Sequence, residues 1–170
     1  QLILAWNRTY KVPYNIVRPT NNYGIGQYVE KLIPKVCKYI DIGKKIPLHN
    51  DGEPYRMWLH AKDTAEAIIL MMEYNVVNEI FNISGDFEQK NIDTVKKIIT
   101  TYGDNRYHID VGEKELDISD YCDFSYDRDG QDVRYSVDDS KLRDLGWKPT
   151  CSFDKELKSI VDFYKGNFIW

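Results

Sequence analysis

Apolar side chains recur along the chain at spacings that predict a mixed α/β fold. From Val29 to Ile40 they are three or four positions apart, so they share one face of a helix that Gly43 should end. Further helices are predicted over residues 65–73, 92–102, 140–145 and 153–164. Short apolar or alternating runs predict strands over residues 14–18, 56–60, 79–83 and 107–111. The first of these runs is apolar enough to predict a buried strand.

The remaining segments fit between these elements. Residues 1–10 have the pattern of a helix end, which Pro13 terminates. Residues 112–129 are acidic and irregular, which predicts a long loop. No internal repeat or low-complexity segment interrupts the alternation of helices and strands. We therefore expect one mixed α/β unit and not two independent domains.

Composition narrows the class of protein. The chain has 170 residues, of which 42% are hydrophobic and 29% charged, so it can bury a core. A net charge of -4 argues against general binding of nucleic acid, although a few cations could still surround one diphosphate. No apolar run is long enough to predict a membrane helix. Three widely spaced cysteines indicate free thiols in a reducing compartment, and we expect a cytoplasmic protein with no metal site.

The segment Arg18–Gly26, with sequence RPTNNYGIG, carries the most specific chemical signal. Asn21 and Asn22 follow a predicted strand, and a helix with Lys31 near its start comes next. In open α/β sheets, ligands bind beyond the carboxyl ends of the strands. Two adjacent asparagines can also be simple turn residues. The wider sequence favours the ligand-binding interpretation.

Seven later segments follow the asparagine pair in a recognisable order: Ile46–His49 with Asp51 and Gly52, Tyr55–Leu59, Asp63–Ala67, Phe81–Gly85, Asn91–Asp93, Asp127–Tyr135 and Leu145–Pro149. In this order the chain resembles the extended short-chain dehydrogenases that act on nucleotide sugars, most closely the nucleotide-diphosphoglucose 4,6-dehydratases. The resemblance implies the C-terminal part of a Rossmann-like fold together with a smaller α/β substrate-binding domain. Residues 1–26 would then end the NAD-binding part. Residues 27–170 would form mainly the substrate-binding part, with some segments returning to the Rossmann sheet.

Two signatures of that family are missing from this sequence. No tyrosine is followed four positions later by lysine, the pair that carries out the redox chemistry in the family. Gly24 and Gly26 match the dinucleotide fingerprint only in part, because Val29 occupies the third glycine position. We expect the chain to be the C-terminal half of an enzyme, with the catalytic residues upstream of Gln1. The 170 residues alone should then show no turnover.

The resemblance implies a set of binding residues. Asn22 matches a contact with NAD, the cofactor of the complete enzyme. The positions that match contacts with the nucleotide sugar are Asn21, Lys31, Leu32, Pro47, Leu48, His49, Arg56, Asn91, Asp127, Arg128, Gly130, Gln131 and Arg134. Guanidinium and ammonium groups suit a diphosphate, whereas Lys and Arg are more often solvated surface charges. Asn91 could equally be a plain helix N-cap.

The activity implied by the resemblance is conversion of dTDP- or UDP-glucose to the 4-keto-6-deoxy sugar nucleotide, a precursor of rhamnose-type sugars, by a homodimer. The family commonly has proline where Asp129 stands and His or Asn where Gln131 stands, so Arg128 is the firmest match in its segment. Alternatives are a 4-epimerase or a decarboxylase of the same superfamily, and a non-catalytic sugar-nucleotide-binding module.

Overall fold

The computed structural model describes residues 1–103 and 117–167, and within them helices and strands alternate as the pattern predicts. The helices are α1 (Leu2–Tyr10), α2 (Leu32–Asp41), α3 (Ala61–Glu73), α4 (Asn91–Tyr102), α5 (Ser140–Arg143) and α6 (Phe153–Tyr164), with 3-10 turns η1 (His49–Gly52) and η3 (Ile118–Asp120). The strands are β1 (Asn15–Pro19), β2 (Asn21–Tyr23), β3 (Ile46–Pro47), β4 (Tyr55–His60), β5 (Glu79–Ile83), β6 (Phe87–Lys90), β7 (Cys122–Asp123) and β8 (Arg134–Tyr135).

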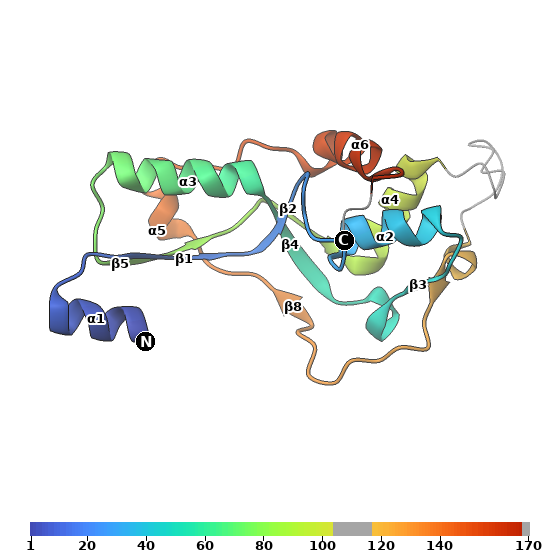
Figure 1. Cartoon of the computed structure of the whole chain (residues 1–170), viewed down its shortest axis with the longest axis horizontal. Coiled ribbons are helices and arrows are strands. Elements are labelled where there is room, and N and C mark those ends of the chain that lie inside the picture. The colour runs from blue at the N-terminus through green and yellow to red at the C-terminus, as the bar shows by residue number, and fades with distance from the viewer. Residues whose placement is uncertain (104–116, 168–170) are drawn as a thin grey trace.

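Parallel pairing dominates the sheets. β1 pairs with β5, and β3 pairs with β7, both in parallel. In the largest sheet β4 is central, with antiparallel β6 along one edge and parallel β2 and β8 along the other. β8 meets the start of β4 and β2 meets its end, because Tyr55 pairs with Arg134 whereas Trp58 pairs with Asn21. The edge of β4 between β8 and β2 lies near the centre of the molecule (Figure 1).

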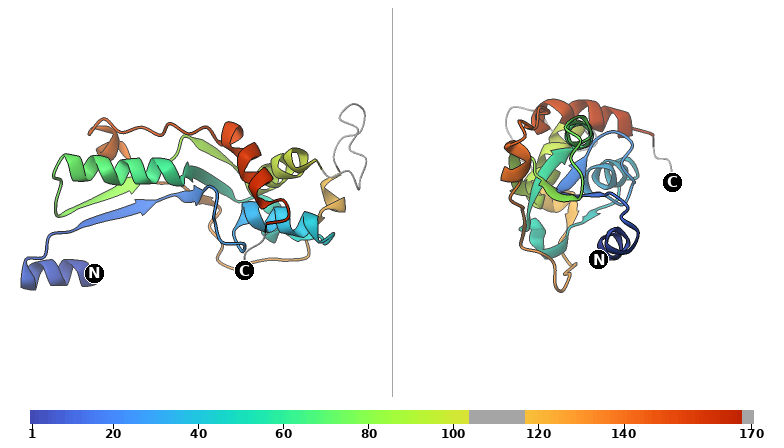
Figure 2. Two further views of the ribbon diagram at one scale, coloured as in Figure 1. Left: turned by 45° about the horizontal axis from the view of Figure 1, so that its top comes forward. Right: turned by 90° about the vertical axis from the view of Figure 1, so that its left-hand side faces the viewer.

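Two hydrophobic cores lie along an elongated molecule. In Figures 1 and 2, α3 lies along one side of the β1–β5 pair, and α1 lies on the other. Leu59, Phe81 and Trp147 belong to the core beneath α3. Helices α2, α4 and α6 pack against one another at the other end, around Ile33, Ile98 and other buried side chains. Within the described ranges, no helix is both long and apolar enough to cross a bilayer.

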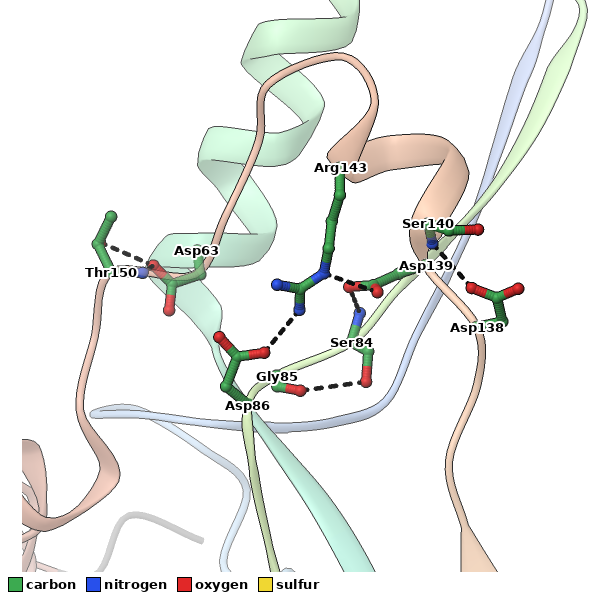
Figure 3. Close-up of polar contacts among 9 residues, drawn as sticks. All are labelled: Asp63, Ser84, Gly85, Asp86, Asp138, Asp139, Ser140, Arg143 and Thr150. Carbon is green, nitrogen blue, oxygen red and sulfur yellow. Dashed lines mark hydrogen bonds and ion pairs between the residues drawn. The ribbon is translucent and has the colours of Figure 1, made fainter.

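A polar network fixes the segment from Asp138 to Thr150 onto the first core (Figure 3). Asp139 accepts hydrogen bonds from the backbone N–H of Ser84 (3.2 Å) and from Nε of Arg143 (2.9 Å), and Arg143 also pairs with Asp86 (2.7 Å). The two carboxylates, Asp139 first, raise the pKa of the Arg143 guanidinium. Because every charge in the network has an internal partner, its role is structural.

Asp63, at the start of α3, anchors the end of the same segment. Its side chain is 1% exposed and accepts hydrogen bonds from the backbone N–H and the hydroxyl of Thr150, both at 2.9 Å. The backbone N–H of Cys151 donates to the same carboxylate. A buried carboxylate with several donors is stable only while those donors remain in place. Asp63 therefore fixes where the chain turns toward α6.

The structure corrects several predicted elements. The run over residues 14–18 forms β1, but it is not buried: Asn15 and Arg18 are exposed and the residues between them are half-buried, because β1 has only β5 beside it. Helix α3 begins four positions earlier than predicted. β6 was not predicted, and η3 and β7 lie in the predicted loop. The predicted strand over 107–111 and the first part of that loop lie outside the described residues.

The asparagine pair lies in a strand that was not predicted, which also excludes the alternative that the two are simple turn residues. Thr20 donates its backbone N–H to the carbonyl of Ile83, which ends the pairing of β1 with β5 (2.9 Å). Asn21 and Asn22 then continue as β2 and pair with β4. The chain thus changes its partner strand at Thr20. Pattern analysis missed β2 because polar residues give no strand periodicity.

Candidate functional site

One cavity of about 390 Å³ opens beside β2 and β4. Seven of the predicted site residues line it: Asn21, Asn22, Lys31, Leu32, Arg56, Asn91 and Gln131. Gln27 and Trp58 complete the lining. These side chains come from four separate regions of the sequence, so only folding brings them together. Amide and cationic side chains that are distant in the sequence therefore lie around one cavity.

Strand geometry places the central lining residues. Arg56 and Trp58 are two positions apart on β4, so their side chains emerge on the same face of the sheet. Asn21 is the register partner of Trp58 on the neighbouring strand, and it therefore lies on that face as well. Lys31 directly precedes α2, and Asn91 is the first residue of α4. Strand β4 thus forms the floor of the cavity, and the starts of two helices form its walls.

The cavity is electropositive, although the chain as a whole is acidic. Lys31 and Arg56 line it, and none of the described lining residues is a carboxylate. Burial lowers the pKa of the Arg56 guanidinium, and the positive charge of Arg128 lowers it further, although Asp132 opposes this. A guanidinium that is partly desolvated and close to a second cation is stabilised by an anion. The site therefore suits a negatively charged ligand.

Backbone carbonyls hold Arg56 in place. Its Nη1 donates to the carbonyl oxygen of Tyr55 (2.6 Å) and to that of Asp132 (3.0 Å), in the segment that leads to β8. Two contacts to carbonyls orient the planar group without neutralising its charge. The remaining N–H groups are available to a ligand, because a guanidinium has five of them. This arrangement presents a preoriented donor to phosphate or carboxylate oxygens.

Asn22 is held by contacts of its own. Its Oδ1 accepts a hydrogen bond from the hydroxyl of Thr64 (2.8 Å), and its Nδ2 donates to the carbonyl of Thr20 (3.1 Å). Its backbone carbonyl accepts from Nε2 of Gln27 (2.7 Å). These contacts fix the Asn22 amide and bring the Gln27 amide beside it. One N–H of Asn22 remains for a ligand.

Three buried polar atoms around the cavity have no hydrogen-bond partner among the described residues. They are Oε1 of Gln27, Nε1 of Trp58 and Oε1 of Gln131. Buried polar atoms in folded proteins nearly always have partners, so each exception calls for an explanation. Three of the residues that line the cavity thus carry one donor and two acceptors without a partner among the described residues.

Asn91 contributes to the cavity and not to capping its helix. The N-cap of α4 is Lys90, and no side-chain cap bond forms there. The interpretation of Asn91 as a plain N-cap is therefore wrong. Because its side chain does not cap the backbone, its amide can contact a ligand in the cavity that it lines.

Pro47, Leu48 and His49, the segment that the family resemblance would place against the nucleobase, lie outside this cavity lining. Leu48 is only 3% exposed and belongs to the core beneath α2, next to Gly52. Pro47 and His49 are half-buried. The His49 ring meets Tyr126 edge-on, with centroids 6.0 Å apart, and its buried Nδ1 has no partner among the described residues. The base-binding role of this segment stays a prediction.

The other predicted contacts lie on the segment that leads to β8 and on β8 itself. Asp127, Arg128 and Gly130 are exposed. The backbone N–H of Arg128 donates to Oδ1 of Asn50 (3.3 Å), which ties the segment to η1. Arg134 forms a two-bond ion pair with Glu88 (2.7 and 3.1 Å), which raises its pKa. Arg128 is close enough to lower the pKa of Arg56. Arg134, in contrast, is already paired with Glu88.

Comparison with known proteins now places the chain. Residues 1–160 match the family model described as GDP-mannose 4,6 dehydratase. The chain belongs to this family. It is 37% identical to the dTDP-glucose 4,6-dehydratase of Haemophilus influenzae and 38% identical to that of Neisseria gonorrhoeae, in each case over 98% of its own length. It spans about half the length of these relatives, 49% and 48% respectively.

Solved structures agree with this family assignment. The dTDP-glucose 4,6-dehydratase of Streptomyces venezuelae, crystallised with NAD, superposes with a TM-score of 0.81 at 32% identity, over 96% of this chain and 47% of that protein. The UDP-glucose 4-epimerase of Thermotoga maritima superposes at 0.78 over 97% of this chain and 50% of that protein, but at only 23% identity, so it shares the fold. The predicted Rossmann-like extended short-chain dehydrogenase fold is confirmed.

Proposed function

We propose that the cavity binds the diphosphate and sugar of a nucleotide-diphosphate sugar, and that the chain is part of an NAD-dependent dTDP-glucose 4,6-dehydratase. One observation carries the proposal: Lys31, Arg56 and several amides line a single cavity in which no described residue is acidic. Cations suit the diphosphate, and neutral amides suit sugar hydroxyls. The two dTDP-glucose 4,6-dehydratases at 37% and 38% identity support the choice of reaction.

In the proposed reaction, the sugar is oxidised at C4, water is eliminated across C5 and C6, and the hydride returns to C6. Bound NAD would accept and return that hydride. The residues of this chain would supply binding and orientation: Lys31 and Arg56 hold the phosphates, while Asn21 and Asn91 contact the sugar. Fixing the sugar relative to the reacting groups accounts for a large part of such a catalytic effect. We propose that the proton-transfer residues lie upstream of Gln1.

The residues around Asn22 fit one edge of a nicotinamide. The carboxamide of that ring carries both a donor and an acceptor. Asn22 has a free N–H, and the neighbouring Gln27 has a buried acceptor with no partner among the described residues. The Streptomyces and Bacillus anthracis dehydratases of known structure were both crystallised with NAD. We therefore keep Asn22 as the proposed cofactor contact.

The remaining expectations are part of the same proposal. α1 is exposed along its length, and Leu2, Ile3 and Trp6 border an apolar groove of about 330 Å³, which supports a homodimer or another covering surface. Cys37 and Cys122 are free and buried, which supports a reducing, cytoplasmic environment. We propose a 4-keto-6-deoxy product of the kind that leads to rhamnose-type sugars. Residues 1–26 would complete the NAD-binding part of the enzyme.

Calorimetry tests the proposal. We expect the 170-residue chain to bind dTDP-glucose with higher affinity than UDP-glucose or GDP-mannose, and to bind none of them after Arg56→Met and Lys31→Met are combined. No 4-keto product should form when NAD is added to this chain alone. Failure of the wild-type chain to bind any of the three sugar nucleotides would contradict the binding proposal. Formation of product by this chain would contradict the proposed upstream location of the catalytic residues.

A further inference from the structure

Trp58 is the one residue of the cavity floor whose buried donor is unexplained. Its side chain is 5% exposed, and its Nε1 has no hydrogen-bond partner among the described residues. Trp147 offers a comparison within the same molecule. It is 6% exposed, but its Nε1 donates to the carbonyl oxygen of Asp63 (3.2 Å). A buried indole N–H normally has such a partner.

Trp58 lines both the ligand cavity, called the outer cavity here, and a smaller inner cavity of about 210 Å³. On the inner side, its ring packs among aromatic rings. Tyr23 lies edge-on with its centroid 6.1 Å away, and Phe153 is tilted at 5.5 Å. On the outer side it borders Asn21 and Arg56 in the cavity with two cations. Only the outer cavity is electropositive, so that cavity is where an anionic acceptor would come to lie.

The position of Trp58 along β4 indicates which part of the ligand would lie nearest to it. Trp58 is two residues beyond Arg56, which corresponds to about 6–7 Å along β4. It is also the direct register partner of Asn21. A guanidinium suits phosphate oxygens, and a neutral amide suits sugar hydroxyls. Trp58 therefore lies where the diphosphate meets the sugar.

We propose that the indole N–H of Trp58 donates a hydrogen bond to an oxygen of the sugar-linked phosphate, which makes Trp58 a further ligand-binding residue of this site. This inference rests on the proposed nucleotide-sugar function and extends it to a specific atom. It also accounts for an aromatic residue with a polar edge on the cavity floor. Phenylalanine would keep an aromatic ring there, although a smaller one, but would leave that oxygen without its donor.

The direct test is the indole N–H signal in proton–nitrogen correlation spectra of the wild-type chain labelled at tryptophan. The Trp58 signal is assigned as the one lost in Trp58→Phe. Saturating dTDP should shift this signal downfield, while the Trp147 signal stays in place. dTMP, which lacks the second phosphate, should leave both signals unchanged.

Binding to Trp58→Phe is the second test. We expect its affinity for dTDP and dTDP-glucose to fall about tenfold to a hundredfold, with little change for dTMP. Its thermal midpoint should fall less than that of Trp147→Phe, because both variants lose buried ring volume but only Trp147→Phe also loses a hydrogen bond to a described residue. Trp147→Phe is the matched control. It loses the bond to Asp63, so it should lower the thermal midpoint but leave affinity for dTDP unchanged.

These experiments distinguish failure of the role of Trp58 from failure of the proposed function. An unmoved Trp58 signal in a chain that binds dTDP would overturn the role of Trp58 alone. An equal loss of affinity for dTMP would also overturn it, because the indole would then only shape the cavity. Failure of the wild-type chain to bind dTDP at all would overturn the proposed function, and this inference with it.

Discussion

Replacing Arg56 with methionine removes the cation that the structure places most firmly in the cavity. Methionine keeps the length and apolar stem of the side chain but lacks its charge and its donors. In the wild type, two carbonyl oxygens hold Nη1, and the remaining N–H groups of the guanidinium are available to a ligand. Arg56→Met should therefore weaken binding of a diphosphate much more than it changes the fold.

The expected effects on ligand affinity and on the free energy of unfolding follow from the contacts that Arg56→Met removes. A hydrogen bond to a charged group contributes about 1.5–3 kcal/mol, which corresponds to about tenfold to 150-fold weaker binding of dTDP-glucose. The free energy of unfolding should change by less than about 1 kcal/mol, because two bonds to the carbonyls of exposed residues are exchanged for solvation. Removal of the charge also ends its repulsion with Arg128 and the desolvation that lowers the pKa of Arg56.

Isothermal titration with dTDP-glucose at two ionic strengths provides the assay, with denaturant unfolding measured in parallel. Arg134→Met is the matched control. Arg134 lies on the neighbouring strand, but it is exposed and paired with Glu88, so affinity should barely change. The salt dependence of binding should also be weaker in Arg56→Met than in the wild type. Equal losses of affinity in the two variants would refute the assignment of Arg56 to the ligand cavity.

Three further predictions concern the framework of the site. Asp63→Asn should lower the free energy of unfolding by about 2–3 kcal/mol and the melting temperature by roughly 5–10 °C, because an amide turns N–H groups toward the donors of Thr150 and Cys151; an unchanged melting temperature would contradict this. Gly85→Ala should prevent native folding, as circular dichroism would show, since a Cβ there overlaps the carbonyl oxygen of Trp58. Burial raises the pKa of Cys37 from 9.0 to about 12 and that of Cys122 from 9.0 to about 11. Unfolded thiols ionise first, so stability should be full below pH 9 and fall as the pH rises from about 9 to 12. The slope should be smaller in a variant with alanine at both positions, and equal slopes would contradict this account.

Much of the fold could be predicted from the sequence, because buried helix faces repeat their apolar residues. The faces of α2, α4 and α6 correspond to the apolar spacing that the sequence shows. β2 was missed because Asn21 and Asn22 are polar, and their pairing with β4 is a tertiary effect. β1 was predicted to be buried because Tyr14, Ile16 and Val17 are apolar, but burial depends on which neighbours cover them.

The site, like the fold, could be predicted from the sequence only in part. Amide and cationic residues were predicted from the resemblance of their segments to a family, and six of them line one cavity. Trp58 could have been found by strand alternation, since it is two positions beyond Arg56. Gln27 could not, because it lies outside the helices and strands and carries no pattern. Nor could the sequence show that Leu48 is buried in the core while Pro47 and His49 are half-buried.

A crystal structure of the chain grown with dTDP is the most direct measurement of the central claim. The account predicts that the diphosphate lies in the cavity on the floor of β4, with its oxygens within hydrogen-bond distance of both Lys31 and Arg56. Density for dTDP on another face of the molecule, with these two side chains turned to solvent, would contradict it.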